Sequence, residues 1–407
     1  MPKTSVAIIG AGIAGLTLAV ALDRAGIDFD VYEQADVLSE VGAGVQLAPN
    51  ASRLLHRLGL RDRLRAVAVE PRAIEMRRWD DGALLQRTPL GEICRGRFGA
   101  PYYTLHRADL HSVLLALVPP ERVHLAARCV AVERMADAAR LELADGTTIE
   151  ADLVVGADGI RSVVREQLVA DRPRYSGQVI YRGLVPAERV PHLLGAEAVR
   201  LWFGPGRHCV CYPVSSGRQV SFGATVPGGA GREESWSAPG NVRDLAAAYE
   251  GWHEDVTGLI GAAESVSRWA LHDRENIKSL VTGRVAIIGD AAHPMLPFQA
   301  QGANQAIEDA AVLARCLADE GPNSLDAALR RYEHVRLART SRIQSRSREN
   351  TESFHLADGV AQRRRDETAG ASSGLDGHAW LFAYDAERAA LADGAAESTA
   401  MPTIGRT

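Results

Sequence analysis

A glycine pattern close to the first residue of the chain constrains the fold more than any other feature of the sequence. Gly10, Gly12 and Gly15 form a G-x-G-x-x-G motif. An apolar run precedes the motif at residues 5–9, and an apolar pattern of helical period follows it at residues 16–25. A motif in this position is typical of a βαβ unit that binds a dinucleotide, because the glycines allow a tight turn and close approach of a pyrophosphate. The helix N-terminus then offers N–H groups to the phosphates.

The second strand of this unit is predicted at residues 28–33 and ends in Glu33. A carboxylate at this position accepts hydrogen bonds from the ribose hydroxyl groups, and it disfavours a 2′-phosphate. The sequence therefore predicts a bound dinucleotide other than NADP. The motif alone does not separate NAD from FAD, and an ordinary glycine-rich turn is the structural alternative.

Composition narrows the class of protein. A length of 407 residues predicts two or more domains, and the net charge of -5 gives no broad positive field for nucleic acid. The five cysteines include no C-x-x-C pair, which favours reduced thiols over disulfides or a zinc site, so we expect no bound metal. The apolar start is broken by glycines and is shorter than the ~20 residues of a membrane span. We therefore expect a cytoplasmic protein that binds neither membrane nor nucleic acid.

The order of patterns along the chain predicts a doubly wound α/β domain interrupted by an antiparallel sheet. Buried parallel strands are predicted at residues 152–156 and 284–289, and a long helix at residues 302–318 follows them. Alternating segments with Gly and Pro turns indicate an antiparallel sheet at residues 173–274. The fold class is therefore α/β, or α+β over the whole chain. The predicted domains are a dinucleotide-binding domain (1–75, 101–172 and 275–325), a substrate domain (76–100 and 173–274) and C-terminal helices with a tail (326–407).

Local patterns add further expectations. We expect one helix over residues 52–66, strands over about residues 70–100, and a loop over residues 227–240. A second long helix is expected at residues 325–356. The small and polar residues after about Ala386 indicate disorder at the end of the chain.

Three more segments carry a family resemblance. Residues 156–162 (GADGIRS) resemble the DG motif of the single-component FAD-dependent aromatic hydroxylases, and residues 289–294 (GDAAHP) resemble their GD motif. Residues 103–110 (YTLHRADL) resemble the start of the arginine-bearing helix of that family. The order and spacing are most similar to the branch with salicylate, 3-hydroxybenzoate and 6-hydroxynicotinate hydroxylases, over nearly the whole chain.

The resemblance implies an FAD-binding domain of the glutathione-reductase type and an antiparallel substrate domain. It implies an NAD(P)H-consuming monooxygenase that hydroxylates a small phenolic or heteroaromatic acid with O2, through a C4a-hydroperoxyflavin, with or without loss of the carboxylate. NADH and NADPH both stay open, as do a monomer and a homodimer. The alternatives are a tailoring hydroxylase or epoxidase for a larger natural product, a flavin-dependent reductase, and a non-catalytic flavin-binding regulatory protein.

The resemblance also implies roles for residues around the cofactor. Asp290 would accept from a ribityl hydroxyl group, Arg107 would hold the ribityl-phosphate side, and Pro294 would pack beside the isoalloxazine ring. The helix that starts at Gly302 would direct N–H groups to the flavin O2 atom, where they stabilise negative charge on the reduced ring. Asp158 has an equally weighted alternative as a cap of its own turn. The expected cofactor contacts are Gly10, Gly12, Gly15, Glu33, Gln34, Gln46, Arg107, Cys129, Asp158, Asp290, Pro294, Gly302, Ala303 and Asn304.

The substrate is expected at the antiparallel sheet. His208 and Tyr212 lie four residues apart on a predicted strand, so both side chains emerge on one face. Without the resemblance, His208 reads more simply as a structural residue. The same pair occurs in the 3-hydroxybenzoate and hydroxynicotinate enzymes, where it is taken to bind and deprotonate the phenolic oxygen of the substrate. A phenolate ring is more nucleophilic than a phenol, and histidine is a suitable proton acceptor near neutral pH.

The sequence departs from these relatives at the pocket. Gln46 stands where the hydroxynicotinate enzyme has a histidine, and Phe298 adds an apolar wall where a relative has a titratable group. The identity of the acid therefore stays open. Arg182 and Arg207 are candidate anchors for a carboxylate, and the expected substrate contacts are Tyr181, Phe298 and Gln299.

Overall fold

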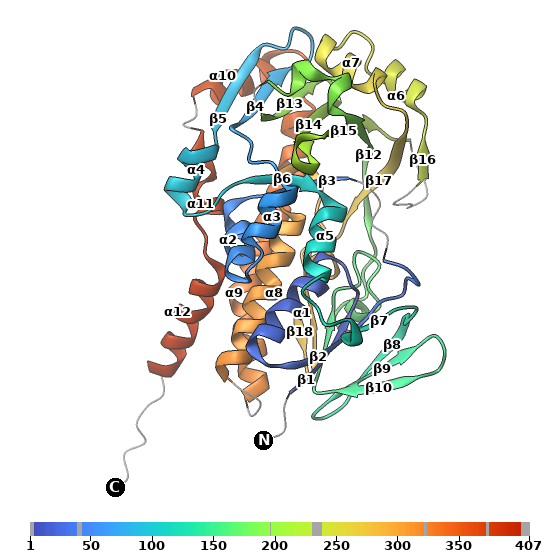
Figure 1. The fold of residues 1–407 in the computed structure, drawn as a ribbon, viewed down its shortest axis with the longest axis vertical. Helices are drawn as coiled ribbons and strands as arrows, with labels where there is room; N and C mark the ends of the chain where they lie inside the picture. The colour runs from blue at the N-terminus through green and yellow to red at the C-terminus, as the bar shows by residue number, and fades with distance from the viewer. Residues whose placement is uncertain are drawn as a thin grey trace.

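The first of two large sheets has six strands (Figure 1). The computed structural model describes residues 4–38, 43–195, 197–229, 238–320, 324–371 and 374–399. Four central strands pair in parallel, as their uninterrupted apolar runs predict. In spatial order the strands are β18 (Val281–Thr282), β19 (Val285–Ile287), β11 (Leu153–Gly156), β1 (Ser5–Ile9), β2 (Asp28–Tyr32) and β7 (Val123–His124).

Three helices pack beside this sheet. α1 (Ile13–Ala25) contacts α8 (Gly302–Glu320), and α8 contacts α9 (Leu325–Phe354). Figure 1 shows α8 and α9 running side by side along the long axis of the molecule. α1 ends at Gly26, whose φ of 68° is favourable only for glycine and a few other residues. The predicted helices after residues 302 and 325 are confirmed.

The second large sheet has eight strands and is antiparallel except for the pair β13–β4. It contains the segments that the sequence predicts to alternate between residues 173 and 274. β4 also belongs to it from Ala73 onward, three residues before the predicted start of that domain. In spatial order the strands are β16 (Ala238–Gly240), β17 (Val266–Asp273), β12 (Arg174–Pro186), β15 (Gln219–Pro227), β14 (Arg207–Val214), β13 (Ala198–Gly204), β4 (Ala73–Arg78) and β5 (Leu84–Pro89).

The two faces of the eight-stranded sheet have different neighbours. α6 (Val242–Ala248) and α7 (Glu254–Gly261) cover one face with buried side chains such as Leu245, Val256 and Leu259. The opposite face is directed toward the N-terminus of α8 and the loop that precedes it. The fold therefore leaves a space between the two large sheets.

Smaller elements connect these layers. A three-stranded meander consists of β8 (Cys129–Arg134), β9 (Ala139–Leu143) and β10 (Thr148–Ala151), and β3 (Gly44–Leu47) pairs with β6 (Tyr103–His106). The remaining α-helices are α2 (Pro49–Arg57), α3 (Arg61–Val67), α4 (Gly91–Phe98), α5 (Arg107–Leu115), α10 (Val360–Ala371), α11 (Leu375–Phe382) and α12 (Ala386–Thr399).

Two local expectations are wrong at turns. The single helix predicted over residues 52–66 is two helices, α2 and α3, because the chain turns at Gly59 with φ of 78°. The predicted loop at residues 227–240 ends in strand β16, which pairs with β17. Residues 230–237 of that loop lie outside the described residues.

Two further expectations are wrong in segments where the sequence shows little helical periodicity. After β4 and β5, the stretch predicted as strands contains helix α4, which buries Cys94 and Phe98 on one face. The end of the chain forms α12 rather than disorder as far as Thr399. Ala386 and Ala390 are fully buried there, because α12 packs on α8 and α9. Small residues allow this close approach, and their polar neighbours conceal it in the sequence.

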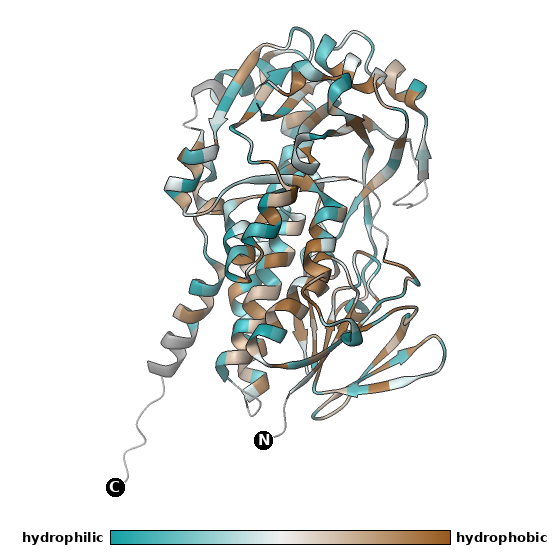
Figure 2. Ribbon diagram, viewed as in Figure 1, coloured by the Kyte–Doolittle hydropathy of each residue, from teal (hydrophilic) through white to brown (hydrophobic). Residues whose placement is uncertain are grey.

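None of the helices in the described residues combines the length and the apolar character that a bilayer crossing needs. Figure 2 shows hydrophilic and hydrophobic residues alternating along the long helices α8 and α9. The buried side of α8 is mostly apolar, whereas the buried side of α9 also carries Arg336, Thr340 and Gln344.

Candidate active site

The glycine motif forms a tight turn. Protein atoms pack closely against Gly10 and Gly15, whereas the space beside Gly12 is open. An added Cβ on Gly15 would lie 1.9 Å from the carbonyl oxygen of Gly10, and one on Gly10 would lie 2.6 Å from that of Ala157. An added Cβ on Gly12 meets no described atom within 4 Å. The open side adjoins the N-terminus of α1, so the turn fits a phosphate group.

Glu33 follows β2 and is held beside this turn. Its carboxylate accepts from the backbone N–H groups of Ala11 (2.8 Å) and Ala35 (2.9 Å). Each carboxylate oxygen accepts more than one hydrogen bond, so Glu33 can also accept from ribose hydroxyl groups. Gln34 beside it is exposed. Cys129 is buried at the start of β8, and its thiol donates to a backbone carbonyl of the same strand.

Asp158 divides its two oxygens between two environments. Oδ2 accepts from the backbone N–H groups of Val163 (2.8 Å) and Val164 (3.3 Å), so it organises the turn after β11. Oδ1 is buried and has no partner among the described residues. Burial raises the pKa of the Asp158 carboxyl group. A buried polar atom without a partner indicates that a bound group or water satisfies it.

Asp290, Arg107 and the first residues of α8 line one cavity. Asp290 lies in a short 3-10 turn after β19, and its side chain is open to the cavity. The surrounding protein raises the pKa of its carboxyl group by desolvation. Arg107 starts α5, and Gly302 and Ala303 bring the N-terminus of α8 to the cavity. This arrangement offers an acceptor, a cation and N–H groups to an elongated polar ligand.

The side-chain amide of Asn304 forms its hydrogen bonds within the protein. Its Oδ1 accepts from the backbone N–H group of Ala48 (2.8 Å), and its Nδ2 donates to the carbonyl oxygens of Gln46 (2.9 Å) and Ala300 (2.8 Å). Both hydrogens of Nδ2 are therefore used, which leaves the backbone of Asn304 for a cofactor. Gln46 lines the cavity, and its Oε1 accepts from the hydroxyl group of Tyr102 at 2.7 Å.

A buried ionic cluster supports the GD segment from behind. Oδ2 of Asp309 lies 2.5 Å from His293 Nε2 and accepts from the backbone N–H group of Gly289 at 2.9 Å. Arg336 of α9 donates to Asp309 (2.7 Å) and to Glu308 (2.5 Å). His293 is absent from the cavity lining, and this contact with Asp309 orders the loop around it. The cluster ties α8, α9 and the GD segment into one unit.

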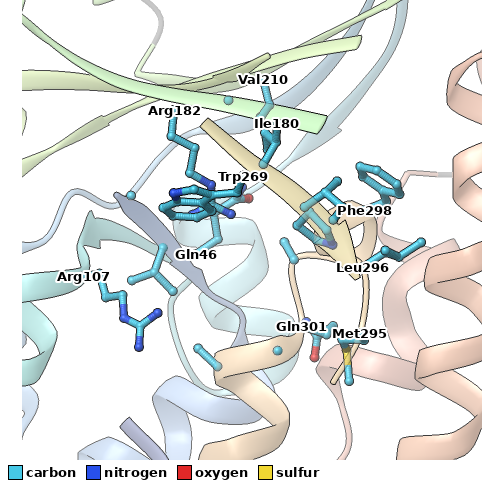
Figure 3. A pocket seen from close by; sticks show the side chains of 18 of the residues that line it. Gln46, Arg107, Ile180, Arg182, Val210, Trp269, Met295, Leu296, Phe298 and Gln301 are labelled. Carbon is cyan, nitrogen blue, oxygen red and sulfur yellow. The ribbon is translucent and has the colours of Figure 1, made fainter. Parts of the chain in front are cut away.

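The eight-stranded sheet and the loop between the GD motif and α8 enclose a cavity of about 230 Å³ (Figure 3). From the sheet it is lined by Ile180, Arg182, His208, Val210, Tyr212 and Gly223. Strand pairing explains this set, because Val210 pairs with Gly223 and Gly223 pairs with Arg182 across three adjacent strands. Gly223 has no side chain, and Ile180 occupies the space beside it, since an added Cβ on Gly223 would lie 3.1 Å from Ile180 Cδ1.

The predicted placement of His208 and Tyr212 on one face of β14 is confirmed, since both line the cavity. Four residues of extended chain span about 13 Å, however, so the two side chains reach different ends of the cavity. His208 contacts the Phe298 ring edge-on at a centroid distance of 5.1 Å. Its Nδ1 lies 2.8 Å from Nε2 of His355. Burial lowers the pKa of His208 well below its usual range, so its imidazole is neutral at physiological pH.

Tyr212 and Arg182 occupy the other end. The guanidinium group of Arg182 lies over the ring of Trp269, with 4.5 Å between its central carbon and the ring centroid (Figure 3). Arg182 forms no ion pair with a carboxylate of the described residues. Burial lowers the pKa of Arg182, and burial raises the pKa of Tyr212 against the opposing effect of that guanidinium. This end of the cavity therefore favours an anion.

Two predicted substrate contacts point elsewhere. Tyr181 is buried on the opposite face of the sheet, because side chains alternate along β12 and its neighbours Ile180 and Arg182 take the cavity side. Gln299 is absent from the cavity lining, and its Oε1 accepts from Nδ2 of Asn350 at 2.9 Å. Only Phe298 of the three lines the cavity, and Gln301 takes the place expected for Gln299.

Two other candidates do not line the cavity. Pro294 is buried, and its carbonyl oxygen accepts from Gln344 at 2.9 Å; Pro297, three residues later, lines the cavity instead. Arg207 precedes His208 on β14 and so faces the other side, where it donates to the backbone of Ala248. Because side chains alternate along a strand, the placement of His208 on the cavity side already excluded Arg207 from the cavity. Trp269 and His355 were missed, since neither belongs to a motif.

The parallel sheet and the glycine turn define a dinucleotide-binding protein whose cavity is lined in part by the aromatic side chains of Tyr212, Trp269 and Phe298. A family model described as an FAD binding domain matches residues 3–347. The chain therefore belongs to this FAD-binding family, and the predicted resemblance is confirmed. The orphaned oxygen of Asp158, the open space at Gly12 and the exposed Asp290 carboxyl group all fit FAD.

Individual relatives place the chain within the family. It is 51% identical over 388 residues to 3-amino-4-hydroxybenzoate 2-monooxygenase of Streptomyces platensis, which covers 94% of this chain and 97% of the relative. It is 38% identical over 356 residues to 6-hydroxynicotinate 3-monooxygenase of Bordetella bronchiseptica, covering 86% and 92%. A salicylate hydroxylase solved with substrate superposes with a TM-score of 0.83 at 28% identity over 99% of both chains. The chain is thus an FAD-dependent aromatic monooxygenase of the salicylate hydroxylase type.

Proposed function

We propose that the enzyme hydroxylates a single-ring aromatic acid that carries a hydroxyl or amino donor group, with NADH or NADPH as reductant, and that 3-amino-4-hydroxybenzoate is its substrate. The observation that carries this proposal is a small cavity with the proton acceptor His208 at one end and the cation Arg182 at the other. The same cavity also has to hold the flavin beside Asp290 and Gly302, which limits the space left for the substrate and disfavours a multi-ring natural product. The identity of 51% with a 3-amino-4-hydroxybenzoate enzyme supports the choice of acid.

The carboxylate of the substrate would bind at the Arg182 end. A guanidinium without a carboxylate partner among the described residues binds an anionic ligand strongly, since both are partly removed from water. Trp269 holds Arg182 by stacking, and the Tyr212 hydroxyl group offers a further donor. This assignment separates the two members of the predicted pair, with Tyr212 acting on the carboxylate and His208 on the ring donor.

The ring donor would lie at the His208 end. In 3-amino-4-hydroxybenzoate the amino group is the donor adjacent to C2. As C2 gains an oxygen atom, the nitrogen shares its electron pair with the ring and becomes positively charged, so its N–H proton becomes acidic. A neutral histidine accepts such a proton readily even when its pKa is low. His208 would therefore take the proton as the C–O bond forms.

The chain would hold FAD along the path from the glycine turn to the cavity. Gly12 and the N-terminus of α1 would bind the pyrophosphate, Glu33 the ribose, and Arg107 with Asp290 the ribityl side, while the backbone of α8 at Gly302 faces the ring. Bound FAD supplies the oxygen activation, after reduction by NAD(P)H. The apolar wall with Phe298 excludes water from the reacting centre.

We also propose that the six-stranded sheet forms the core of the FAD domain and that the eight-stranded sheet forms the substrate domain. The five free cysteines are all buried thiols, which supports a reducing, cytoplasmic location.

The proposal is tested with the purified FAD-loaded enzyme and a panel of aromatic acids. The panel contains 3-amino-4-hydroxybenzoate, 3-hydroxybenzoate, 6-hydroxynicotinate, salicylate and a multi-ring phenol. NADH and NADPH oxidation, O2 uptake and product mass are measured together. We expect coupled turnover with 3-amino-4-hydroxybenzoate and a product that gains one oxygen atom and keeps its carboxylate. Turnover only with the multi-ring phenol, or reductant consumption without O2 uptake, would refute it.

A further inference from the structure

His208 is connected to a second histidine behind the cavity wall. Nδ1 of His208 and Nε2 of His355 are 2.8 Å apart, and the two rings stack with their centroids 5.0 Å apart. The Thr225 hydroxyl group lies 3.1 Å from the first nitrogen and 3.3 Å from the second. The three groups therefore form one hydrogen-bonded cluster, and only His208 of the three lines the cavity.

The backbone fixes His355 in this position. It follows the last residue of α9, where its N–H group donates to the carbonyl oxygen of Glu352 at 3.3 Å. Its own carbonyl oxygen accepts from the N–H group of Gly206, which lies in the turn before β14. The contact between the imidazoles thus joins the C-terminal end of α9 to the strand that carries His208.

The hydrogen bond decides which nitrogen of His208 faces the substrate. Because Nδ1 is engaged with His355 and Thr225, Nε2 remains for the cavity. If Nδ1 carries the hydrogen and donates to His355, then Nε2 presents a lone pair and can accept a proton. If His355 is the donor instead, Nε2 carries a hydrogen and cannot act as a base. Only the first arrangement agrees with His208 as a proton acceptor.

The surroundings of the two histidines are aromatic. Phe203, Phe298 and Phe354 contact the His208 ring, and Phe298 also contacts that of His355. Neither histidine pairs with a carboxylate of the described residues, and Arg365 of α10 lies over the Phe203 ring. Burial lowers the pKa of His208 well below its usual range and that of His355 to about 4.

We propose that His355 receives the proton that His208 removes from the ring donor of the substrate, so that the two form a proton relay. The inference rests on the proposed role of His208. In the step, the N–H or O–H bond of the donor breaks and an N–H bond forms at Nε2 of His208. The hydrogen on Nδ1 of His208 passes at the same time to Nε2 of His355. His208 ends neutral and His355 ends as an imidazolium. The electron pair of the broken bond stays on the donor atom of the substrate.

This relay moves positive charge one ring further from the reacting carbon. The electrophilic oxygen transfer requires an electron-rich ring, and an imidazolium in contact with the substrate opposes it. His355 acts through His208 and is a positioning residue, because it does not line the cavity. Phe354 next to it contacts His208 and so keeps the relay dry.

The test compares His355→Gln and His355→Ala with a control variant, all with FAD bound. Glutamine can still accept the hydrogen of Nδ1 but cannot carry the proton away, whereas alanine removes both functions. His378→Gln is the matched control, because His378 is a half-buried histidine of α11 that stacks on Phe382. Measured quantities are FAD content, the rate of FAD reduction by NAD(P)H, and the rate of product formation in a single turnover with O2.

We expect both His355 variants to bind and reduce FAD at the wild-type rate and to form product at least 10-fold more slowly. Added imidazole is expected to restore part of the rate in His355→Ala, which a loss of structure would not allow. A wild-type rate in His355→Gln, or no response to imidazole in His355→Ala, would overturn the relay. If His208→Phe still forms product, the proposed role of His208 fails; if it does not while His355→Gln does, only the relay fails.

Discussion

The guanidinium carbon of Arg182 lies 4.5 Å from the centroid of the Trp269 ring, and both residues line the cavity. If Arg182 binds the substrate carboxylate, Arg182→Gln removes a charge-assisted hydrogen bond worth about 1.5–3 kcal/mol. The KM for the acid is then expected to rise about 10- to 100-fold, with unchanged FAD content. Arg268→Gln is the control, because Arg268 stacks on Tyr181 at the other face of the sheet. Steady-state kinetics measure both, and an unchanged KM in Arg182→Gln contradicts the assignment.

His208→Phe should separate reductant consumption from product formation. The phenyl ring keeps the aromatic packing with Phe298 but has no proton acceptor. Product formation is expected to fall about 10²-fold or more, while FAD stays bound and NAD(P)H oxidation continues with release of hydrogen peroxide. The ratio of product to NAD(P)H consumed reports this change. His192→Phe, on the surface of the same domain, should leave the ratio unchanged.

Gly12→Ala should weaken FAD binding without disturbing the fold. No described atom lies within 4 Å of the added Cβ, so the apoprotein is expected to unfold at the wild-type temperature. The methyl group occupies the open side of the turn, and the Kd for FAD is expected to rise at least 10-fold. Gly15→Ala should instead reduce the yield of folded protein, because its Cβ lies 1.9 Å from the Gly10 oxygen. Flavin fluorescence titration and thermal unfolding distinguish the two, with Gly96→Ala in α4 as control.

Arg336→Leu should destabilise the whole FAD domain. Arg336, Glu308 and Asp309 are all fully buried, and the change leaves two carboxylates with fewer partners. Removing one member of a buried ion pair costs about 3–5 kcal/mol, so the midpoint of urea unfolding should fall clearly. Arg346→Leu breaks an exposed pair with Glu349 and should cost less than about 1 kcal/mol. Equal effects of the two changes would show that the cluster is not a stabilising unit.

Stability should depend on pH through His56. Burial, followed by the charges of Arg61 and Arg65, lowers its pKa to about 4 in the folded protein, against about 6.5 when unfolded. The unfolded chain thus binds the extra proton first, so stability is complete above about pH 6.5 and falls as the pH drops toward 4. His56→Gln should show a smaller loss of unfolding free energy between pH 6.5 and 4.5 than the wild type. Urea unfolding at several pH values measures this slope.

Sequence patterns were sufficient for the strand, turn and helix that form the proposed nucleotide site. Gly10, Gly12, Gly15 and Glu33 are close in sequence, and the strand, turn and helix around them form from local interactions with characteristic spacing. The parallel strands were recognisable as uninterrupted apolar runs, and alternation on β14 correctly placed His208 and Tyr212 on one face. Alternation on β12 also carried the information that Tyr181 and Arg182 face opposite sides.

What the sequence by itself determined is the dinucleotide turn with the strand and helix around it, because these depend on contacts between near neighbours. The choice of FAD followed from the resemblance of three further segments. Only the tertiary structure decided which side chains meet at the cavity. Arg182 and Trp269 are 87 positions apart and meet because β12 pairs with β17, and His208 and His355 meet because α9 ends beside β14. Such partners come together through strand pairing and helix packing over long separations, which no local spacing records. The chemistry at the substrate end is therefore a product of the packed fold.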